Sequence, residues 1–133
     1  PAFTPLPKPL NECTVALVTT AGVHLASQTP FDLRDEHGDW TWRAIPGDVD
    51  VRDIVVSHEH YDTSDANSDP NVVFPIDALR TLARDGMVGG ISTLHAGLMG
   101  WIPDGTPLRD ETAPEVARAL REAGADAVVL TPG

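Results

Sequence analysis

The chain has 133 residues, a 41% apolar content and a net charge of −11, from 9 Lys and Arg against 20 Asp and Glu. This length and apolar fraction suit one domain with its own core and exclude wholesale disorder. The acidic balance excludes a basic surface for nucleic acid or anionic membranes, and the single cysteine, Cys13, excludes an internal disulfide and fits a reducing cytoplasm.

Residues 1–13 predict a proline-rich extended arm, and 14–133 predict the N-terminal part of a single α/β domain. The arm begins "PAFTPLPKPL", which lacks both the charged and the apolar region of a signal peptide. No apolar run approaches the about 20 residues of a transmembrane helix. The sequence therefore predicts a cytoplasmic protein.

Short apolar runs predict the strands. The runs at 14–20, 53–57 and 126–131 are rich in β-forming residues and end in polar or Gly-rich turns, so we expect buried strands. Residues 88–94 predict a weaker strand, and the alternation of "DWTWRAI" (39–45) predicts an edge strand.

Two helices are expected between the strands. Residues 74–85 carry Pro75 in the first turn and Gly86 just past the end. The second helix is predicted to start at a capping box of Thr112 and Glu115 and to end at Gly124. Apolar strands that alternate with amphipathic helices favour an α/β, Rossmann/flavodoxin-like fold, with a mostly parallel sheet and helices on both faces.

The segment "SHEHYD" (57–62) places two histidines and a carboxylate directly after an apolar run. His58, His60 and Asp62 match the His-x-His-x-Asp-His metal motif of the metallo-β-lactamase superfamily, but Thr63 stands where that motif has its last histidine. The incomplete set favours a polar crevice without a metal. A metal-dependent hydrolase using these three residues remains an alternative.

The thiol of Cys13 is a weaker candidate. It precedes the first strand, outside any Gly-rich or helix-N-terminal setting that would depress a thiol pKa. We expect a structural cysteine.

Read together, several segments resemble the selenoprotein B family of the glycine, sarcosine, betaine and D-proline reductases. The likeness runs nearly end to end and is strongest to the D-proline reductase branch. The segments that carry it, in order, are "VALVTTAGVHL", "PFDL" with "RAIPGD", "SHEHYD" with "NVVFPIDAL", "MG", and "ETAPEVARALREAGADAVVLTPG".

The resemblance implies an oxidoreductase with a selenocysteine or cysteine nucleophile that cleaves a carbon–heteroatom bond. In that family the nucleophile directly follows the last strand. The resemblance therefore implies a catalytic Cys or Sec immediately after Gly133, outside this chain. A continuing or processed C-terminal segment is therefore an expected partner, together with a small-molecule substrate and a second reductase subunit.

The same resemblance implies roles for residues at the strand ends. His58, Tyr61 and Asp62 become acid/base or substrate-orienting groups, since cleavage needs a proton donor for the leaving group. His60 has a weaker claim, because the D-proline reductase pattern has glycine there. Expected substrate-binding positions are Thr20, Gly22, His24, Asp65 and Gly133; periodicity alone assigns His24 and His95 a structural role more readily.

No cofactor is expected in this chain. The resemblance implies a dithiol or thioredoxin-type reductant and leaves room for a pyruvoyl group on a partner subunit. A further alternative is a non-catalytic subunit that completes a site on another chain.

Two structural expectations follow. Gly22, His58 and Gly133 should lie near one edge of the sheet, because ligands bind beyond the carboxyl ends of strands in α/β sheets. The strand at 126–131 is apolar throughout, so it should lie inside the sheet with neighbours on both sides. The fold would then be incomplete without a further segment.

Overall fold

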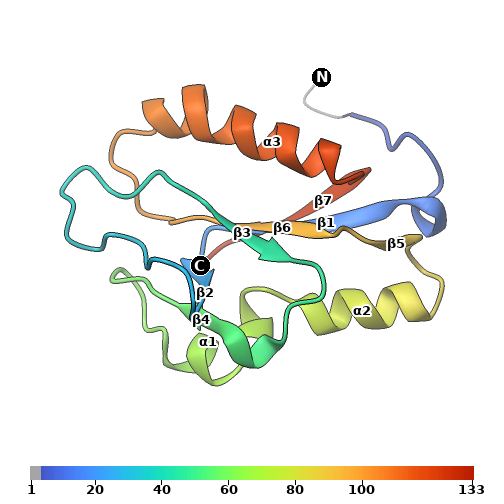
Figure 1. Cartoon of the computed structure of the whole chain (residues 1–133), viewed down its shortest axis with the longest axis horizontal. Coiled ribbons are helices and arrows are strands. Elements are labelled where there is room, and N and C mark those ends of the chain that lie inside the picture. Colours follow the sequence, from blue (N-terminus) through green and yellow to red (C-terminus); the bar gives the residue numbers. More distant parts are fainter. Residues whose placement is uncertain (1–3) are drawn as a thin grey trace.

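A computed structural model describes residues 4–133, so the first three residues of the predicted arm lie outside it. The chain forms a mixed α/β fold around one five-stranded sheet, with a separate two-stranded ribbon beneath it (Figure 1). No helix in this described part is long and apolar enough to cross a membrane. The strands are β1 Thr14–Thr19, β2 Val23–Leu25, β3 Arg43–Pro46, β4 Ile54–Val56, β5 Gly90–Ile91, β6 Leu94–Gly97 and β7 Ala127–Thr131.

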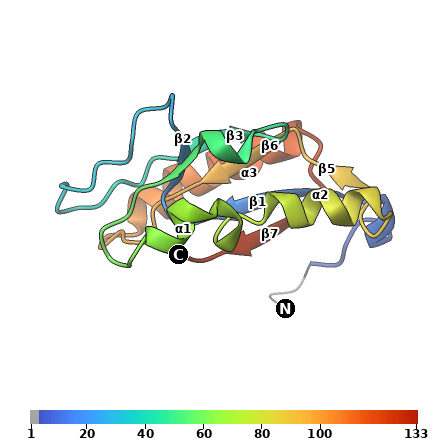
Figure 2. The ribbon, with the colours of Figure 1, turned by 90° about the horizontal axis from the view of Figure 1, so that it is seen from below.

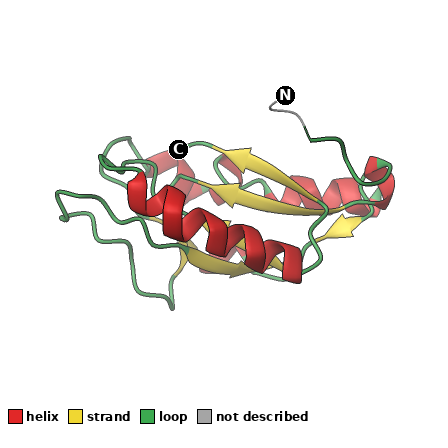
Figure 3. Ribbon diagram, turned by 90° about the horizontal axis from the view of Figure 1, so that it is seen from above, coloured by secondary structure: helices red, strands yellow, loops and turns green. Residues whose placement is uncertain are grey.

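The helices lie on both faces of the sheet. Figure 3 shows α3 crossing the upper face, and Figure 2 shows α1 and α2 on the lower one. The helices are α1 Ser64–Ser68, α2 Ile76–Arg84 and α3 Ala113–Glu122, with short 3-10 turns η1 Leu10–Glu12, η2 Val51–Asp53 and η3 Pro70–Val72, and a π-helical turn η4 Leu108–Thr112.

Strand β1 is the centre of the sheet. It pairs in parallel with β5 and β6 on one side and with β7 on the other. Val15 and Leu17 pack into the core cluster on the α2 face, whereas Ala16 and Val18 pack into the cluster on the α3 face. Burial on both faces explains why the sequence of β1 is continuously apolar.

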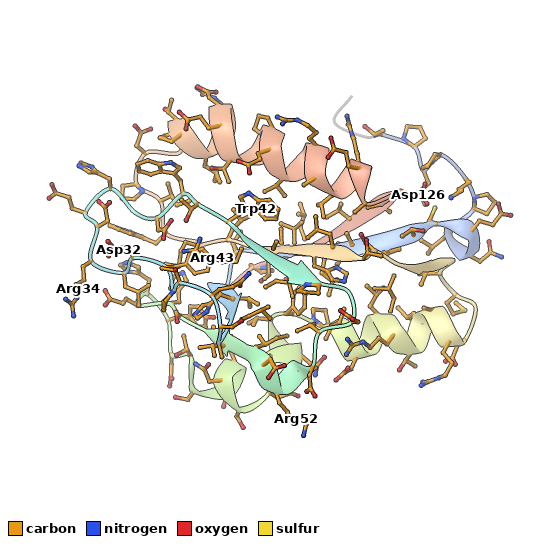
Figure 4. All side chains as sticks on the ribbon, in the orientation of Figure 1. Asp32, Arg34, Trp42, Arg43, Arg52 and Asp126 are labelled. Carbon is orange, nitrogen blue, oxygen red and sulfur yellow. The ribbon has the colours of Figure 1, made fainter. Side chains whose placement is uncertain are left out.

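The sheet is mixed: β1 pairs in parallel with β5, β6 and β7, whereas β3 and β6 are antiparallel, and the expected Rossmann/flavodoxin-like topology is not confirmed. The edge strand β3 runs antiparallel to β6, with Ile45 opposite His95. It is the edge strand predicted from "DWTWRAI". Trp42 precedes β3 and lies between that strand and α3 (Figure 4), where its indole N–H donates to Glu115 at 3.1 Å.

The run at 53–57 is a strand, but it belongs to another sheet than expected. Ile54–Val56 pairs antiparallel with β2 in the two-stranded ribbon. A short loop with Gly22 at φ +77° joins β1 to β2 and turns the chain out of the main sheet. The apolar character of β4 reflects burial of Ile54 and Val56 in the cluster on the α2 face.

Strand β7 has one neighbour within the described chain, and the second neighbour expected for it is not supplied by residues 4–133. Among residues 4–133 its only strand partner is β1. Its apolar side chains are exposed as a result: Val128 by 43%, Val129 by 45% and Leu130 by 75%.

The predicted end of one helix is confirmed, whereas the predicted start of the other is wrong. Helix α2 stops before Gly86, which has φ +72°, as expected of a C-terminal glycine. The capping box is wrong, because helical turns already run through Leu108–Thr112 before α3. The Thr112 hydroxyl instead donates to the carbonyl oxygen of Trp40 at 2.6 Å.

Two side chains with candidate chemistry are structural. The Cys13 thiol is fully buried and donates to the carbonyl oxygen of Lys8 at 3.4 Å. His95 is fully buried, and its Nδ1 accepts a 2.8 Å hydrogen bond from the backbone N–H of Leu17. Since β5 pairs at Val15 and β6 pairs only from Val18, His95 supplies the acceptor that the ladder lacks at Leu17.

The predicted arm is tied to the start of β7. The ammonium group of Lys8 lies 2.8 Å from a carboxylate oxygen of Asp126, which also accepts a 2.8 Å hydrogen bond from the backbone N–H of Thr14. Asp126 lies at the end of the sheet opposite Gly133 (Figure 4). Residues 4–13, the described part of the arm, therefore run toward the end of β7 that lies away from Gly133.

Candidate functional site

The ends of β1 and β7 meet at the carboxyl edge of the sheet. The backbone N–H of Thr20 donates to the carbonyl oxygen of Thr131 at 3.0 Å. Two residues on, a Cβ added at Gly133 would stand 2.4 Å from the Cα of Ala21. Only a residue without a side chain fits there, so Gly133 packs directly on the turn after β1.

Tyr61 closes the same turn from the other side. Its hydroxyl donates a 2.9 Å hydrogen bond to the carbonyl oxygen of Ala21, and burial raises its pKa. The ring centroid of His58 lies 4.8 Å from that of Tyr61. Gly133, Ala21, Tyr61 and His58 are thus one cluster, although the sequence separates them widely.

The geometry of the "SHEHYD" turn selects the tautomer of His58. Its Nδ1 accepts a 3.0 Å hydrogen bond from the backbone N–H of His60, so the proton of the neutral imidazole is on Nε2. The Nε2 atom is buried and has no hydrogen-bond partner among the described residues. Burial, followed by the nearby charge of His60, lowers the pKa of His58. The arrangement is a neutral imidazole with an unused N–H.

Gly22 and Thr20 belong to this edge, as expected. A Cβ at Gly22 would stand 2.0 Å from the carbonyl oxygen of Ser57, which places the turn after β1 against the start of "SHEHYD". Thr20 lies beside Gly100, whose added Cβ would meet the Thr20 carbonyl oxygen at 2.9 Å and His58 Nε2 at 3.2 Å. Gly22, His58 and Gly133 therefore do share one edge.

Three other predicted positions are placed differently. His24 is buried, with Nε2 2.9 Å from the Ser57 hydroxyl and Nδ1 2.8 Å from the Leu25 carbonyl oxygen, so both nitrogens are occupied within the protein. Asp65 is exposed in the first turn of α1. The exposed Asp62 carboxylate accepts hydrogen bonds from the backbone N–H and the hydroxyl of Ser64, which lower its pKa.

The metal alternative finds no support in the geometry. Within the part of the chain that the structure describes, no three His, Cys, Asp or Glu side chains are grouped so as to hold a metal ion. The carboxylate of Asp62 accepts a hydrogen bond from the backbone N–H of Ser64 at the start of α1, and His58 Nδ1 accepts one from the backbone N–H of His60.

Sequence reasoning missed Gly100 and Trp101. The indole of Trp101 stacks on the His60 ring, with centroids 4.6 Å apart and planes 27° apart. The only sequence signal was the "MG" pair at 99–100, which carries no chemistry by itself. An isolated bridge between Ala21 and Met99 brings this segment to the site.

The surface beside the histidines is open and polar. A shallow hollow of about 520 Å³ reaches Glu59, the residue between His58 and His60. Arg34 lines it and extends outward from the loop before β3 (Figure 4). Its other lining residues are Phe31, Asp32 and Leu33.

Comparison with known proteins identifies relatives of this chain. The chain is 47% identical to the D-proline reductase subunit gamma of Acetoanaerobium sticklandii, over the whole chain and 54% of that protein. It is 30% identical to a glycine reductase complex component B subunit gamma of Symbiobacterium thermophilum and 29% identical to a betaine reductase complex component B subunit beta of Peptoclostridium acidaminophilum, in each case over 93% of the chain and 29% of the relative. No solved structure matches.

The chain thus spans about half the length of the D-proline reductase subunit and under a third of the other two. The family model of the glycine/sarcosine/betaine reductase selenoprotein B matches residues 3–133. This chain belongs to the glycine/sarcosine/betaine reductase selenoprotein B family.

Proposed function

We propose that this chain is the histidine-bearing part of a selenol- or thiol-dependent reductase that cleaves a carbon–nitrogen bond of a small amino acid or N-methylated amino acid. Its family and the names of its relatives support the reaction class. The carrying observation is that Gly133 packs on Ala21, whose carbonyl holds Tyr61 beside His58.

The nucleophile in this proposal is a Cys or Sec brought to Gly133 by another stretch of polypeptide, either a continuation or a separate subunit. Its thiolate or selenolate would lie close to His58. A neighbouring anion favours the protonated imidazole and so offsets the burial that lowers the His58 pKa. The pair then resembles other ion pairs that keep a chalcogen nucleophile ionised.

The reaction has two bond-forming steps. The chalcogenolate attacks the substrate carbon and displaces the amine, which takes a proton from the His58 imidazolium. Protonation of His58 requires Nδ1 to give up the hydrogen bond that it accepts from the His60 backbone N–H, and the bond re-forms once the proton has been given to the amine. A second thiol then attacks the chalcogen, the carbon–chalcogen bond breaks, and the carbon takes a proton as reduced product. The two electrons pass into the C–H bond of the product, which leaves the protein oxidised as a selenylsulfide or disulfide, and an external dithiol of thioredoxin type reduces it again.

In this scheme Tyr61 contacts the substrate, whereas Asp62 acts only indirectly. The Tyr61 proton is engaged by Ala21, so we assign its phenol the role of fixing the turn and accepting a hydrogen bond from substrate. Asp62 is exposed and shapes the start of α1, so it acts on the site only through the turn it stabilises. A pyruvoyl group is assigned to a partner subunit, and no step of this chain requires it.

The open edge of β7 is where we expect the polypeptide that carries the nucleophile. An edge strand is ordinarily protected by charge or by a covering segment, yet Ala127–Thr131 contains no charged residue. The exposed Val128, Val129 and Leu130 offer apolar surface for a partner. The relatives are longer than this chain and are named as subunits or complex components, which supports the expectation of further polypeptide.

The test uses the reductase complex assembled from this chain and its partners, with D-proline, glycine, sarcosine and betaine each supplied together with dithiothreitol. His58→Gln should lower kcat about 100-fold or more, as expected for loss of a general acid. His37→Gln is the matched control, because His37 is an exposed histidine whose ring pairs only with Glu36. Full activity of the His58→Gln complex would refute the proposed role.

A further inference from the structure

We infer that Gly100 and Trp101 are positioning residues that hold the two imidazoles of the "SHEHYD" turn. Each of these consecutive residues contacts one histidine: Gly100 lies against His58 and Trp101 against His60. The inference deepens the proposed function, since it names what orients the acid of that site. Its geometry can be tested without reference to activity.

The backbone of this segment is rigidly placed. The N–H of Leu98 donates to the Thr19 carbonyl oxygen and the N–H of Gly22 donates to the Leu98 carbonyl oxygen, each at 2.8 Å. Met99 forms a bridge with Ala21 one residue later. The segment after β6 is therefore fixed to the end of β1, and Gly100 and Trp101 cannot drift relative to Gly133.

Gly100 limits the position of His58 by its lack of a side chain. A Cβ there would stand 2.9 Å from the Thr20 carbonyl oxygen and 3.2 Å from His58 Nε2. The contact with the Thr20 carbonyl oxygen would force the backbone to shift, and the contact with Nε2 would require the imidazole to yield by a few tenths of an ångström. Gly100 does not have a positive φ, unlike Gly22, Gly38, Gly86 and Gly124 of the described chain. The need for glycine at position 100 is therefore steric and not conformational.

Trp101 limits the position of His60. The two rings are nearly parallel with centroids 4.6 Å apart, while the His58 and His60 rings are 5.8 Å apart and almost perpendicular. Stacking keeps the exposed His60 ring against the protein. It also fixes the backbone N–H of His60, which donates to His58 Nδ1 and sets that ring's tautomer. Through this bond the stack on His60 also orients His58.

Histidine-ring NMR tests the contact of Trp101. The indole ring current should place the His60 ring protons upfield of those of the exposed His37. Trp101→Ala should move the His60 signals downfield toward the His37 position, and Trp101→Phe should retain much of the shift. Trp42→Ala, which removes an indole bonded to Glu115 instead, should leave His60 in place.

The contact of Gly100 is tested with Gly100→Ala. We expect a changed ring-nitrogen signature for His58 that reports loss of the Nε2–H tautomer or of its bond to the His60 amide. Gly105→Ala is the matched control, because a Cβ there meets nothing within 4 Å. Unchanged His60 shifts in Trp101→Ala, or unchanged His58 nitrogens in a folded Gly100→Ala protein, would overturn the inference.

The two hypotheses fail separately. If the NMR changes occur but the His58→Gln complex keeps its activity, the positioning role of Gly100 and Trp101 is supported and the proposed function is refuted. If His58→Gln loses activity but Trp101→Ala leaves the His60 signals unmoved, the reverse holds. Should Gly100→Ala not fold, the Trp101→Ala and Trp101→Phe pair still decides, because Trp101 is partly exposed and stacks outside the core.

Discussion

The hydroxyl of Tyr61 donates a 2.9 Å hydrogen bond to the carbonyl oxygen of Ala21, and this bond joins the "SHEHYD" turn to the end of the central strand. Gly133 packs against the Cα of the same residue, Ala21. One backbone residue therefore holds the candidate acid site and the end of β7 together. In the proposed function, a nucleophile beside Gly133 would therefore be linked to Tyr61 and His58 through Ala21.

Tyr61 is the single tyrosine of the chain, so its ionisation can be followed directly by ultraviolet absorbance. Burial raises its pKa above the ordinary value of 10.0, and we expect the midpoint in the folded protein to lie above that of the urea-unfolded chain. Tyr61→Phe should abolish the signal and cost about 1 kcal/mol of stability, since the Ala21 carbonyl loses its donor. A folded-state midpoint equal to the unfolded one would contradict this placement.

Gly22 should be far less tolerant of alanine than Gly86, although both have positive φ, of +77° and +72°. At Gly86 an added Cβ meets nothing within 4 Å, so Gly86→Ala should cost only the conformational term, about 1–2 kcal/mol. At Gly22 the Cβ would stand 2.0 Å from the Ser57 carbonyl oxygen, and Gly22→Ala should be more destabilising. Urea unfolding of the pair measures the difference, and equal losses would argue against the Gly22–Ser57 contact.

His95 should make the fold sensitive to acid. Burial, with a smaller effect of Arg80, lowers its pKa from 6.5 to about 4. Above pH 6.5 both folded and unfolded states are neutral at this ring. Below it the unfolded state binds the proton first, so stability falls between pH 6.5 and 4, by at most about 3 kcal/mol.

Urea unfolding of wild type and His95→Gln across that pH range checks this prediction. The glutamine amide cannot titrate, so the variant should start less stable at pH 7 but lose less stability on acidification. Parallel pH profiles for the two proteins would mean that other groups cause the acid sensitivity.

Leu130→Lys should weaken binding of the partner polypeptide while leaving this chain folded. Leu130 is 75% exposed, so the substitution should change the stability of the isolated chain by less than about 0.5 kcal/mol. Placing a charge on the apolar edge of β7 should raise the dissociation constant measured by calorimetry. The control, Leu82→Lys, changes an exposed leucine on α2. Equal affinities for wild type and Leu130→Lys would exclude this edge as the docking surface.

Much of the local structure could be predicted because its signals are local. The apolar run of β1, the helix that ends before Gly86 and the alternation before β3 each reflect propensities and burial of adjacent residues. The family likeness also located "SHEHYD" and the strand before Gly133 as parts of one site. These elements could be predicted without knowing which other segment each of them pairs with.

Pairing was decided only by the tertiary structure. An apolar run indicates burial, but it does not indicate which strand lies alongside. Ile54–Val56 was therefore assigned to the wrong sheet, and the pairing of Ala127–Thr131 with β1 could be read only from the structure. The contacts that build the site are equally non-local: Ala21 touches both Tyr61 and Gly133, and Gly100 touches His58. The sequence by itself determined which residues are buried or polar, whereas chain packing determined which of them meet, because close approach of backbone to backbone leaves no periodic trace along the chain.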